Sequence, residues 1–222
     1  TFEMNGGSVR TYDSGYATVR NNQENEGAST FKIIAGSIIG PTNAIYNLYN
    51  GNVIIEGGTL ERTTSGIAIY NNSTGIITIG TKDQNVDTSA PIIKNTGGST
   101  VSNRLGTLNF YDGVLIGEEN NVIDGMLNEI EDETEIVKDT KEDGLQHVTL
   151  GIPTYYVAKI AESDNPDISN LDSRYYKLED GYYYFITLNS AVEASNINNA
   201  TTIELIDNPM VYRKIDIAPN QN

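Results

Sequence analysis

The stretch Asn43–Leu60, NAIYNLYNGNVIIEGGTL, is the pattern around which this chain is organised, because related stretches precede and follow it. It reads as two short strands joined by an Asn-Gly turn, with a Gly-Gly pair near its end. The related stretches are 1–9, 16–22 with 30–39, 66–80 and 100–115. Repeats of about 20–50 residues are typical of proteins in which no single repeat can bury its own apolar face. The sequence therefore predicts a stack of short strands.

The second strand of each repeat alternates apolar and polar residues with a period of two. Such alternation directs one set of side chains to a single face of a strand. In the aligned repeats, the apolar residues predict an internal column, and the glycines predict bends with positive φ angles. The aligned residues are Phe2, Met4, Gly7 and Val9; Phe31, Ile33, Gly36 and Ile38; Val53, Ile55, Gly58 and Leu60; Ile77 and Ile79; and Leu108, Phe110, Gly113 and Leu115.

The first strand of each repeat carries a different column, in which Asn follows an aliphatic residue by two positions. These asparagines are Asn21, Asn47, Asn71 and Asn103. A buried amide is costly unless it is hydrogen-bonded. Amides stacked about 4.8 Å apart, the spacing of neighbouring strands, can bond to one another. We interpret the four asparagines as a structural ladder and favour this role over ligand binding.

The same strands direct Arg20, Tyr46 and Tyr70 to the opposite side, which is the outer surface. Stacked rings there could lie against the faces of sugars, so these three residues are candidates for ligand binding. The alternative is ordinary packing, because aromatic neighbours on adjacent strands stabilise a sheet. We favour the packing alternative, since aromatic residues are common on strands in any case.

Three phrases carry a resemblance to a known family: GTLNFYDGVLIG, IITIGTKDQN and NEIEDETEIV. They resemble segments of right-handed parallel β-helices of the pectate-lyase-like superfold, in particular bacterial surface proteins known as adhesins. The resemblance covers most of residues 1–150 and returns in 175–222. It implies an all-β fold, a right-handed parallel β-helix (solenoid) with a hairpin cap, followed by a small β-rich module with one short helix. It also implies an extracellular location on the bacterial cell surface.

Composition and patterning divide the chain into three segments. Residues 1–117 hold the repeated strands of the expected β-helix. Residues 118–152 contain eleven acidic residues and two lysines, and we expect a hairpin cap there, because an uncovered last repeat would expose strand edges. Residues 153–222 are expected to be a connector and the start of a second β-helix module, with a hairpin, a capping helix over 187–195 and further strands.

The position of Thr1 inside a repeat predicts that the chain is a segment of a longer protein. Strand edges left uncovered at its ends are templates for pairing with another chain. Contacts between the start of one segment and the end of another propagate into filaments if they do not close. We therefore expect the ends either to fray or to associate end to end.

The overall charge and the missing residue types exclude several functions. The net charge is −16, which argues against nucleic acid as a partner, because nucleic-acid binding needs a basic surface. The chain has no Cys, so it can form neither disulfides nor thiolate metal sites. No apolar run approaches the roughly 18 residues of a membrane span. The single histidine, His147, has no second His or Cys beside it to suggest a metal site or a triad.

A loop at 81–91 contains a spacing that resembles the start of a calcium-binding loop. Asp83, Asn85 and Asp87 alternate as calcium ligands do, but Thr88 stands where such a loop needs Gly, and Lys94 where it needs Glu. We therefore predict a solvated loop with no metal and no cofactor, and keep the three residues as the metal candidates.

No catalytic residues are predicted, because the strand carboxylates are dispersed. Glu3, Glu56 and Asp112 fall in different repeats, and glycoside hydrolysis needs two carboxyls at a defined separation. The sequence thus predicts a non-catalytic segment of a bacterial cell-surface or secreted repeat protein, acting as a structural stalk or adhesin. The alternative is a carbohydrate-binding module that uses the outward Tyr and Arg residues, and an enzyme similar to polysaccharide lyases or hydrolases is less favoured. Expected partners are host or bacterial surface glycans or proteins.

Overall fold

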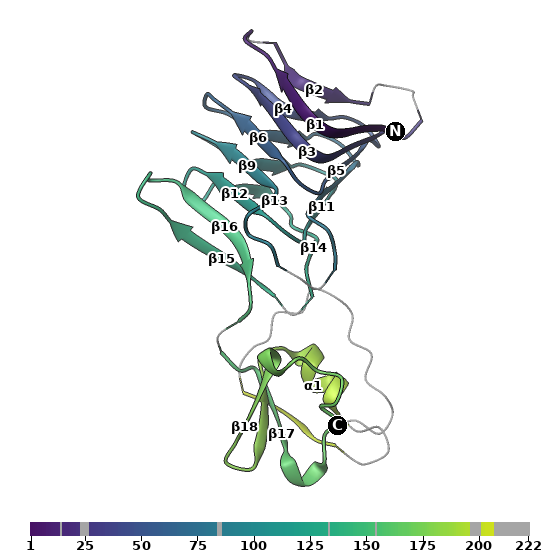
Figure 1. Ribbon diagram of the computed structural model, residues 1–222, viewed down its shortest axis with the longest axis vertical. Coiled ribbons are helices and arrows are strands. Elements are labelled where there is room, and N and C mark those ends of the chain that lie inside the picture. Colours follow the sequence, from purple (N-terminus) through teal and green to yellow (C-terminus); the bar gives the residue numbers. More distant parts are fainter. Residues whose placement is uncertain are drawn as a thin grey trace. The chain divides into compact units, whose positions relative to one another are not determined.

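The structure is a computed structural model, and it describes residues 1–13, 15–22, 27–83, 86–132, 134–153, 155–195 and 201–206. The chain divides into two units (Figure 1). Unit 1 comprises Thr1–Glu131 and Ile136–Gly151, and unit 2 comprises Asp132–Glu135 and Ile152–Asn222. Among the described residues, no helix has the length and apolar character needed to cross a lipid bilayer.

Strands, up to three in each repeat, build unit 1. They are β1 (Phe2–Arg10), β2 (Ala17–Asn21), β3 (Thr30–Gly40), β4 (Asn43–Asn47), β5 (Asn52–Ile55), β6 (Thr59–Arg62), β7 (Ile69–Asn71), β8 (Ile76–Ile79), β9 (Ile92–Asn95), β10 (Val101–Asn103), β11 (Thr107–Phe110), β12 (Val114–Gly117), β13 (Ile123–Gly125), β14 (Glu129–Ile130), β15 (Glu135–Thr140) and β16 (Gln146–Gly151). Figure 1 shows these strands lying side by side across the unit.

Two sheets hold these strands together. The larger sheet follows the order β14-β11-β8-β5-β3-β6-β9-β12-β16-β15, and β1 pairs with β3 off this path. The smaller sheet has the order β13-β10-β7-β4-β2 and is parallel throughout. Equivalent positions of successive repeats are register partners, for example Phe31 with Val53 and Val53 with Ile77. The repeated phrases therefore pair in register across both sheets.

The predicted fold class, a right-handed parallel β-helix (solenoid), is wrong. The chain is all-β, but its main sheet is mixed, and the ten-strand path curls into a nearly closed barrel. Two features of the chain produce this result. The eleven-residue β3 runs through a bend and pairs with β5 by its first half and with β6 by its second half, so it joins both arms into one sheet. At the end of the path, β16 pairs with β12 in the antiparallel direction.

The core of unit 1 comes from the alternating residues that face inward. Their side chains are fully buried, and they include Ile33, Ile38, Ile45, Ile55, Leu60, Ile69, Ile77, Ile79, Ile93, Leu108, Phe110 and Leu115. The bend in β3 occurs at Gly36, whose φ is 105°. A Cβ atom at Gly58 in the next repeat would lie 2.5 Å from the carbonyl oxygen of Gly36. Only glycine permits this close stacking of bends.

A four-stranded sheet packed on a short helix forms unit 2. The strands are β17 (Ala158–Ala161), β18 (Tyr176–Glu179), β19 (Tyr182–Phe185) and β20 (Ile203–Leu205), in the order β18-β19-β17-β20. All pairs are antiparallel. Two single 3-10 turns, η1 (Glu162–Asp164) and η2 (Ser173–Tyr175), lie in the connections.

Helix α1 (Leu188–Ala194) covers the apolar face of this sheet. Thr187 caps it, and the side-chain oxygen accepts the Ser190 N–H at 3.1 Å. Ala191 and Ala194 pack with Phe185 and Ile160 in the core of the unit. Of the further strands expected in this module, β20 is described, and any part of them within residues 207–222 lies outside the described residues.

Candidate functional site

The inward asparagines form a continuous row of hydrogen-bonded amides. Asn21 Nδ2 donates to Asn47 Oδ1 at 2.8 Å, Asn47 Nδ2 to Asn71 Oδ1 at 3.0 Å, and Asn71 Nδ2 to Asn103 Oδ1 at 2.9 Å. The second Nδ2 proton of each binds a backbone carbonyl, such as that of Gly51 at 2.7 Å from Asn47. All four side chains are buried. With its hydrogen bonds made internally, this row has no polar group that faces a ligand.

The outward residues of the same strands also lie in a row. Arg20 on β2 is the register partner of Tyr46 on β4, and Tyr46 is the register partner of Tyr70 on β7. The two tyrosine rings are stacked, with centroids 5.3 Å apart and planes 6° from parallel. Such a pair stabilises the surface by about 0.5–1.5 kcal/mol beyond its buried area.

Asn72 holds the hydroxyl ends of both rings. Its Nδ2 donates to Tyr46 Oη at 3.1 Å, and its Oδ1 accepts from Tyr70 Oη at 2.7 Å. The Tyr46 hydroxyl therefore keeps its own proton for donation, while the Tyr70 hydroxyl keeps lone pairs for acceptance. This arrangement presents one donor and one acceptor on a rigid aromatic edge.

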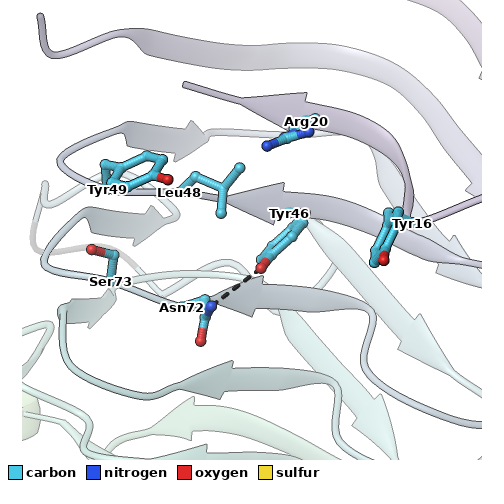
Figure 2. Close-up of a pocket in the computed structure, with 7 residues that line it drawn as sticks. All are labelled: Tyr16, Arg20, Tyr46, Leu48, Tyr49, Asn72 and Ser73. Atoms are coloured by element: carbon cyan, nitrogen blue, oxygen red, sulfur yellow. Dashed lines mark hydrogen bonds between the residues drawn. The ribbon is translucent and has the colours of Figure 1, made fainter. Parts of the chain in front are cut away.

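A groove of about 460 Å³ opens beside these rings. We call it the tyrosine groove, and its lining consists of Tyr16, Arg20, Tyr46, Leu48, Tyr49, Asn72 and Ser73 (Figure 2). Tyr16 is 88% exposed and Tyr49 is 38% exposed, so two further rings are open to solvent. Leu48 is almost fully buried. The groove thus combines aromatic walls with amide, hydroxyl and guanidinium groups.

Tyr49 enters the groove from a strained turn. Its φ of 51° lies in the left-handed region, which is uncommon for a bulky residue. The turn is held by hydrogen bonds from Gly51 N to the Leu48 carbonyl at 3.0 Å and from Leu48 N to the Asn21 carbonyl at 3.1 Å. Residues held in such conformations cost about 1–3 kcal/mol and cluster at ligand-binding and active sites. The backbone strain therefore marks this turn as a functional candidate.

Of the three predicted binding residues, the groove includes Arg20 and Tyr46. Tyr70 stacks against Tyr46 and does not line the groove. No sequence pattern predicted the other lining residues, most of which flank the repeated strands: Tyr16, Leu48, Tyr49, Asn72 and Ser73. The repeated phrase offered one indication of these residues, because polar or aromatic residues follow each Asn of the ladder in the next turn.

The predicted metal candidates lie in a loop that is anchored by backbone N–H groups. Asn85 lies outside the described residues. Asp87 N donates to Asp112 Oδ1 at 2.7 Å, and Asp83 N donates to the buried Glu131 carboxylate at 3.1 Å. Within the described part of the chain, no three His, Cys, Asp or Glu side chains gather closely enough to hold a metal ion.

Burial changes the acidity of one carboxyl in this region. Desolvation raises the pKa of Asp112 above its ordinary value, although hydrogen bonds from the backbone of Asp87 and Thr81 act in the opposite direction. The pKa of Asp87 is lowered by hydrogen bonds from Ser89. Both carboxylates accept backbone N–H groups, so their contacts are those of residues that shape a loop.

The remaining strand carboxylates do not pair with each other. Glu56 forms an ion pair with Lys32 at 2.8 Å, and Glu3 is the register partner of the same lysine. Asp112 instead accepts from the loop described above. The structure therefore brings Glu3 and Glu56 to one lysine, and it does not bring them together with Asp112 as a pair of catalytic carboxyls.

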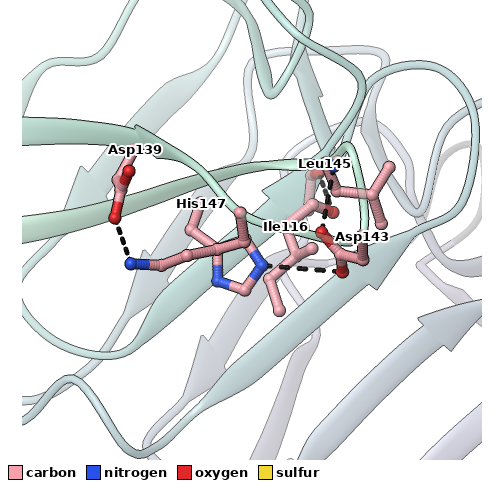
Figure 3. Close-up of polar contacts among 7 residues, drawn as sticks. Ile116, Asp139, Asp143, Leu145 and His147 are labelled. Atoms are coloured by element: carbon pink, nitrogen blue, oxygen red, sulfur yellow. Dashed lines mark hydrogen bonds and ion pairs between the residues drawn. The ribbon is translucent and has the colours of Figure 1, made fainter.

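His147 is the second residue of β16, next to the turn of the β15–β16 hairpin (Figure 3). Its Nε2 atom is 3.8 Å from an Asp143 carboxylate oxygen, and the other Asp143 oxygen accepts the Leu145 N–H at 3.0 Å. Lys141 pairs with Asp139 on the same hairpin. The histidine is the register partner of Ile116 on β12. These contacts belong to the hairpin and its packing.

Comparison with known proteins returns no match, whether with protein-family models, curated proteins or solved structures.

Proposed function

We propose that this chain is a non-catalytic carbohydrate-binding segment of an extracellular protein, and that an oligosaccharide occupies the tyrosine groove. The observation that carries the proposal is the fixed aromatic edge. Tyr46 and Tyr70 are stacked, and Asn72 holds both hydroxyls. From the sequence we favoured simple packing of the outward residues over ligand binding. We now favour binding, because the groove adds Tyr16, Tyr49 and Asn72 to these residues.

The chemistry of a sugar matches the lining of this groove. A pyranose presents an apolar face of C–H groups and a rim of hydroxyls. Aromatic side chains offer large apolar surfaces with a polar end, and a few placed polar groups fix the orientation of a ligand. Tyr46, Tyr49 and Tyr16 supply the surfaces, while Asn72 and Ser73 supply hydrogen-bonding groups.

Preorganisation favours binding at this site. Tyrosine loses little conformational entropy on binding because it has only two χ angles. Here the Asn72 amide and the Tyr46–Tyr70 stack already hold one ring, and the strained turn already holds Tyr49. Groups that are ordered before the ligand arrives do not oppose binding through lost entropy.

Two equally exposed tyrosines provide a matched test. Tyr16 lines the groove and is 88% exposed, whereas Tyr12 lies outside the lining and is 86% exposed. A glycan array should first identify a bound oligosaccharide, and calorimetric titration should then compare Tyr16→Ala, Tyr46→Ala and Tyr12→Ala. We expect weaker binding in the first two variants and unchanged binding in the third. Equal affinities in all three variants, or no bound glycan on the array, would overturn the proposal.

The absence of acidic residues from the lining supports a non-catalytic role. Enzymes that hydrolyse glycosides use a pair of carboxyl groups that flank the scissile bond. The lining of the tyrosine groove contains Tyr, Arg, Leu, Asn and Ser residues. Incubation with the bound oligosaccharide should leave its chain length unchanged. Release of fragments that ceases in Tyr46→Ala would instead identify an enzyme.

A structural stalk is the second candidate, and the amide row favours it. A row of buried, mutually bonded side chains that runs through four strands rigidifies the stack. A bacterial surface location follows from the resemblance alone and stays a prediction. A full-length gene with a signal peptide and a wall anchor would support it. An array without bound glycans would leave the stalk as the favoured function.

A further inference from the structure

The tyrosine groove has a positive charge in a strongly acidic chain. Arg20 is the one formally charged residue of its lining, and the net charge of the chain is −16. Tyr16, Leu48 and Ser73 complete a lining that is otherwise neutral. An anionic group that approaches the groove therefore meets an attractive site on a surface that repels it elsewhere.

Arg20 is also available for a ligand. Within the described part of the chain, its guanidinium forms no hydrogen bond or ion pair, and the residue is exposed. Several other cations of the chain are engaged, as Lys32 is with Glu56 and Lys177 is with Glu179 at 2.7 Å. All N–H donors of the Arg20 guanidinium are therefore free, and two of them can bind two oxygens of one anion.

The strand order places this charge beside the aromatic surface. In the smaller sheet β4 lies between β7 and β2, so Tyr70 stacks on one side of Tyr46 and Arg20 lies on the other. Neighbouring strands are about 4.8 Å apart. A sugar seated against Tyr46 from the β2 side would therefore carry its ring substituents within reach of the guanidinium. Figure 2 shows Arg20 and Tyr46 on adjacent strands of the groove.

We propose that the groove selects oligosaccharides that carry an oxyanion, either a sulfate or a carboxylate, and that Arg20 determines this specificity. This inference rests on the proposed carbohydrate-binding function. Ion pairs between exposed groups are weak, so the charge selects among sugars while the rings supply most of the affinity. The planar fork of Arg suits both oxyanions in two-point contacts, which a lysine ammonium does not reproduce.

The test compares charged disaccharides with their neutral parents. The probes are an N-acetyllactosamine with a 6-sulfate and its unsulfated parent, and a glucuronic-acid disaccharide and its glucose parent. With the wild-type chain at low salt we expect at least one charged probe to bind about fivefold tighter than its parent. The difference should shrink as ionic strength rises, because exposed charges are screened. The pair that shows the preference identifies the oxyanion.

Three variants isolate the role of Arg20. Arg20→Gln should bind the charged and neutral probes equally, and Arg20→Lys should retain part of the preference. Arg10→Gln is the matched control. Arg10 is exposed and lies outside the lining, and its replacement removes the same net charge. It should behave as the wild type. Folding of each variant is checked by circular dichroism.

The outcomes separate this inference from the function on which it rests. If neutral parents bind as tightly as charged probes, or if Arg10→Gln lowers the preference as much as Arg20→Gln, the role of Arg20 is refuted and carbohydrate binding stands. If the four probes and the array glycans all fail to bind at millimolar concentration, both proposals fail.

Discussion

Replacing Asn47 by Leu tests the amide row at its centre. The Asn47 side chain is fully buried and takes part in three hydrogen bonds. Leucine fills a comparable volume, but it cannot form hydrogen bonds with the former partners of Asn47. Gly51 O keeps a second donor, the N–H of Ile76 at 3.1 Å, whereas Asn71 Oδ1 and one proton of Asn21 Nδ2 lose the partner that they have in the structure.

The expected loss follows from these two groups. Each buried group without a partner costs about 1–3 kcal/mol, so the loss of two partners should lower the free energy of unfolding by about 2–6 kcal/mol. Urea denaturation followed by circular dichroism measures the change, and hydrogen exchange at β4 and β7 locates it in unit 1. The matched control is Asn109→Leu, because Asn109 lies half-buried on β11 and its side chain has no hydrogen-bond partner among the described residues.

The control should change the free energy of unfolding by less than about 0.5 kcal/mol, as exposed substitutions usually do. An equally small effect of Asn47→Leu would refute a stabilising role of the amide row. Such a result would mean that Asn21 and Asn71 find other partners at no cost, and that the row is not what holds these strands in register.

Three further outcomes are expected. Gly58→Ala should destabilise the protein more than Gly144→Ala in urea denaturation, because both have positive φ but a Cβ would meet backbone only at Gly58; equal losses would contradict this. Millimolar calcium should leave the melting temperature unchanged, and a rise that Asp83→Ala abolishes would reveal a metal site. Because the pKa of Asp112 is raised by burial, the folded state binds the proton more tightly, so stability should fall as pH rises from 3.8 through the raised pKa. Asp112→Asn should flatten that fall, and an unchanged pH profile would show that this carboxyl does not cause it.

The candidate site could be predicted only in part, because its residues come from two kinds of backbone. Arg20 and Tyr46 belong to strands, where alternation decides which side a residue faces. Tyr49 belongs to a turn, and its position depends on a left-handed φ angle, which is not predicted for a tyrosine from sequence. Asn72 reaches both hydroxyls only because β4 and β7 are aligned. The groove is thus a product of strand register and turn conformation together.

The local register of the strands follows from the repeated phrases. Where the same phrase recurs, equal residues face each other, as Ile45 does Ile69 and Tyr46 does Tyr70, because any slip by one residue would move apolar side chains out of the core. How the strands close into one sheet could be seen only in the folded chain. That closure depends on β3 continuing through the bend at Gly36 and on β16 pairing antiparallel with β12. Neither feature follows from the repeats, because period-two alternation is the same for a parallel and an antiparallel neighbour.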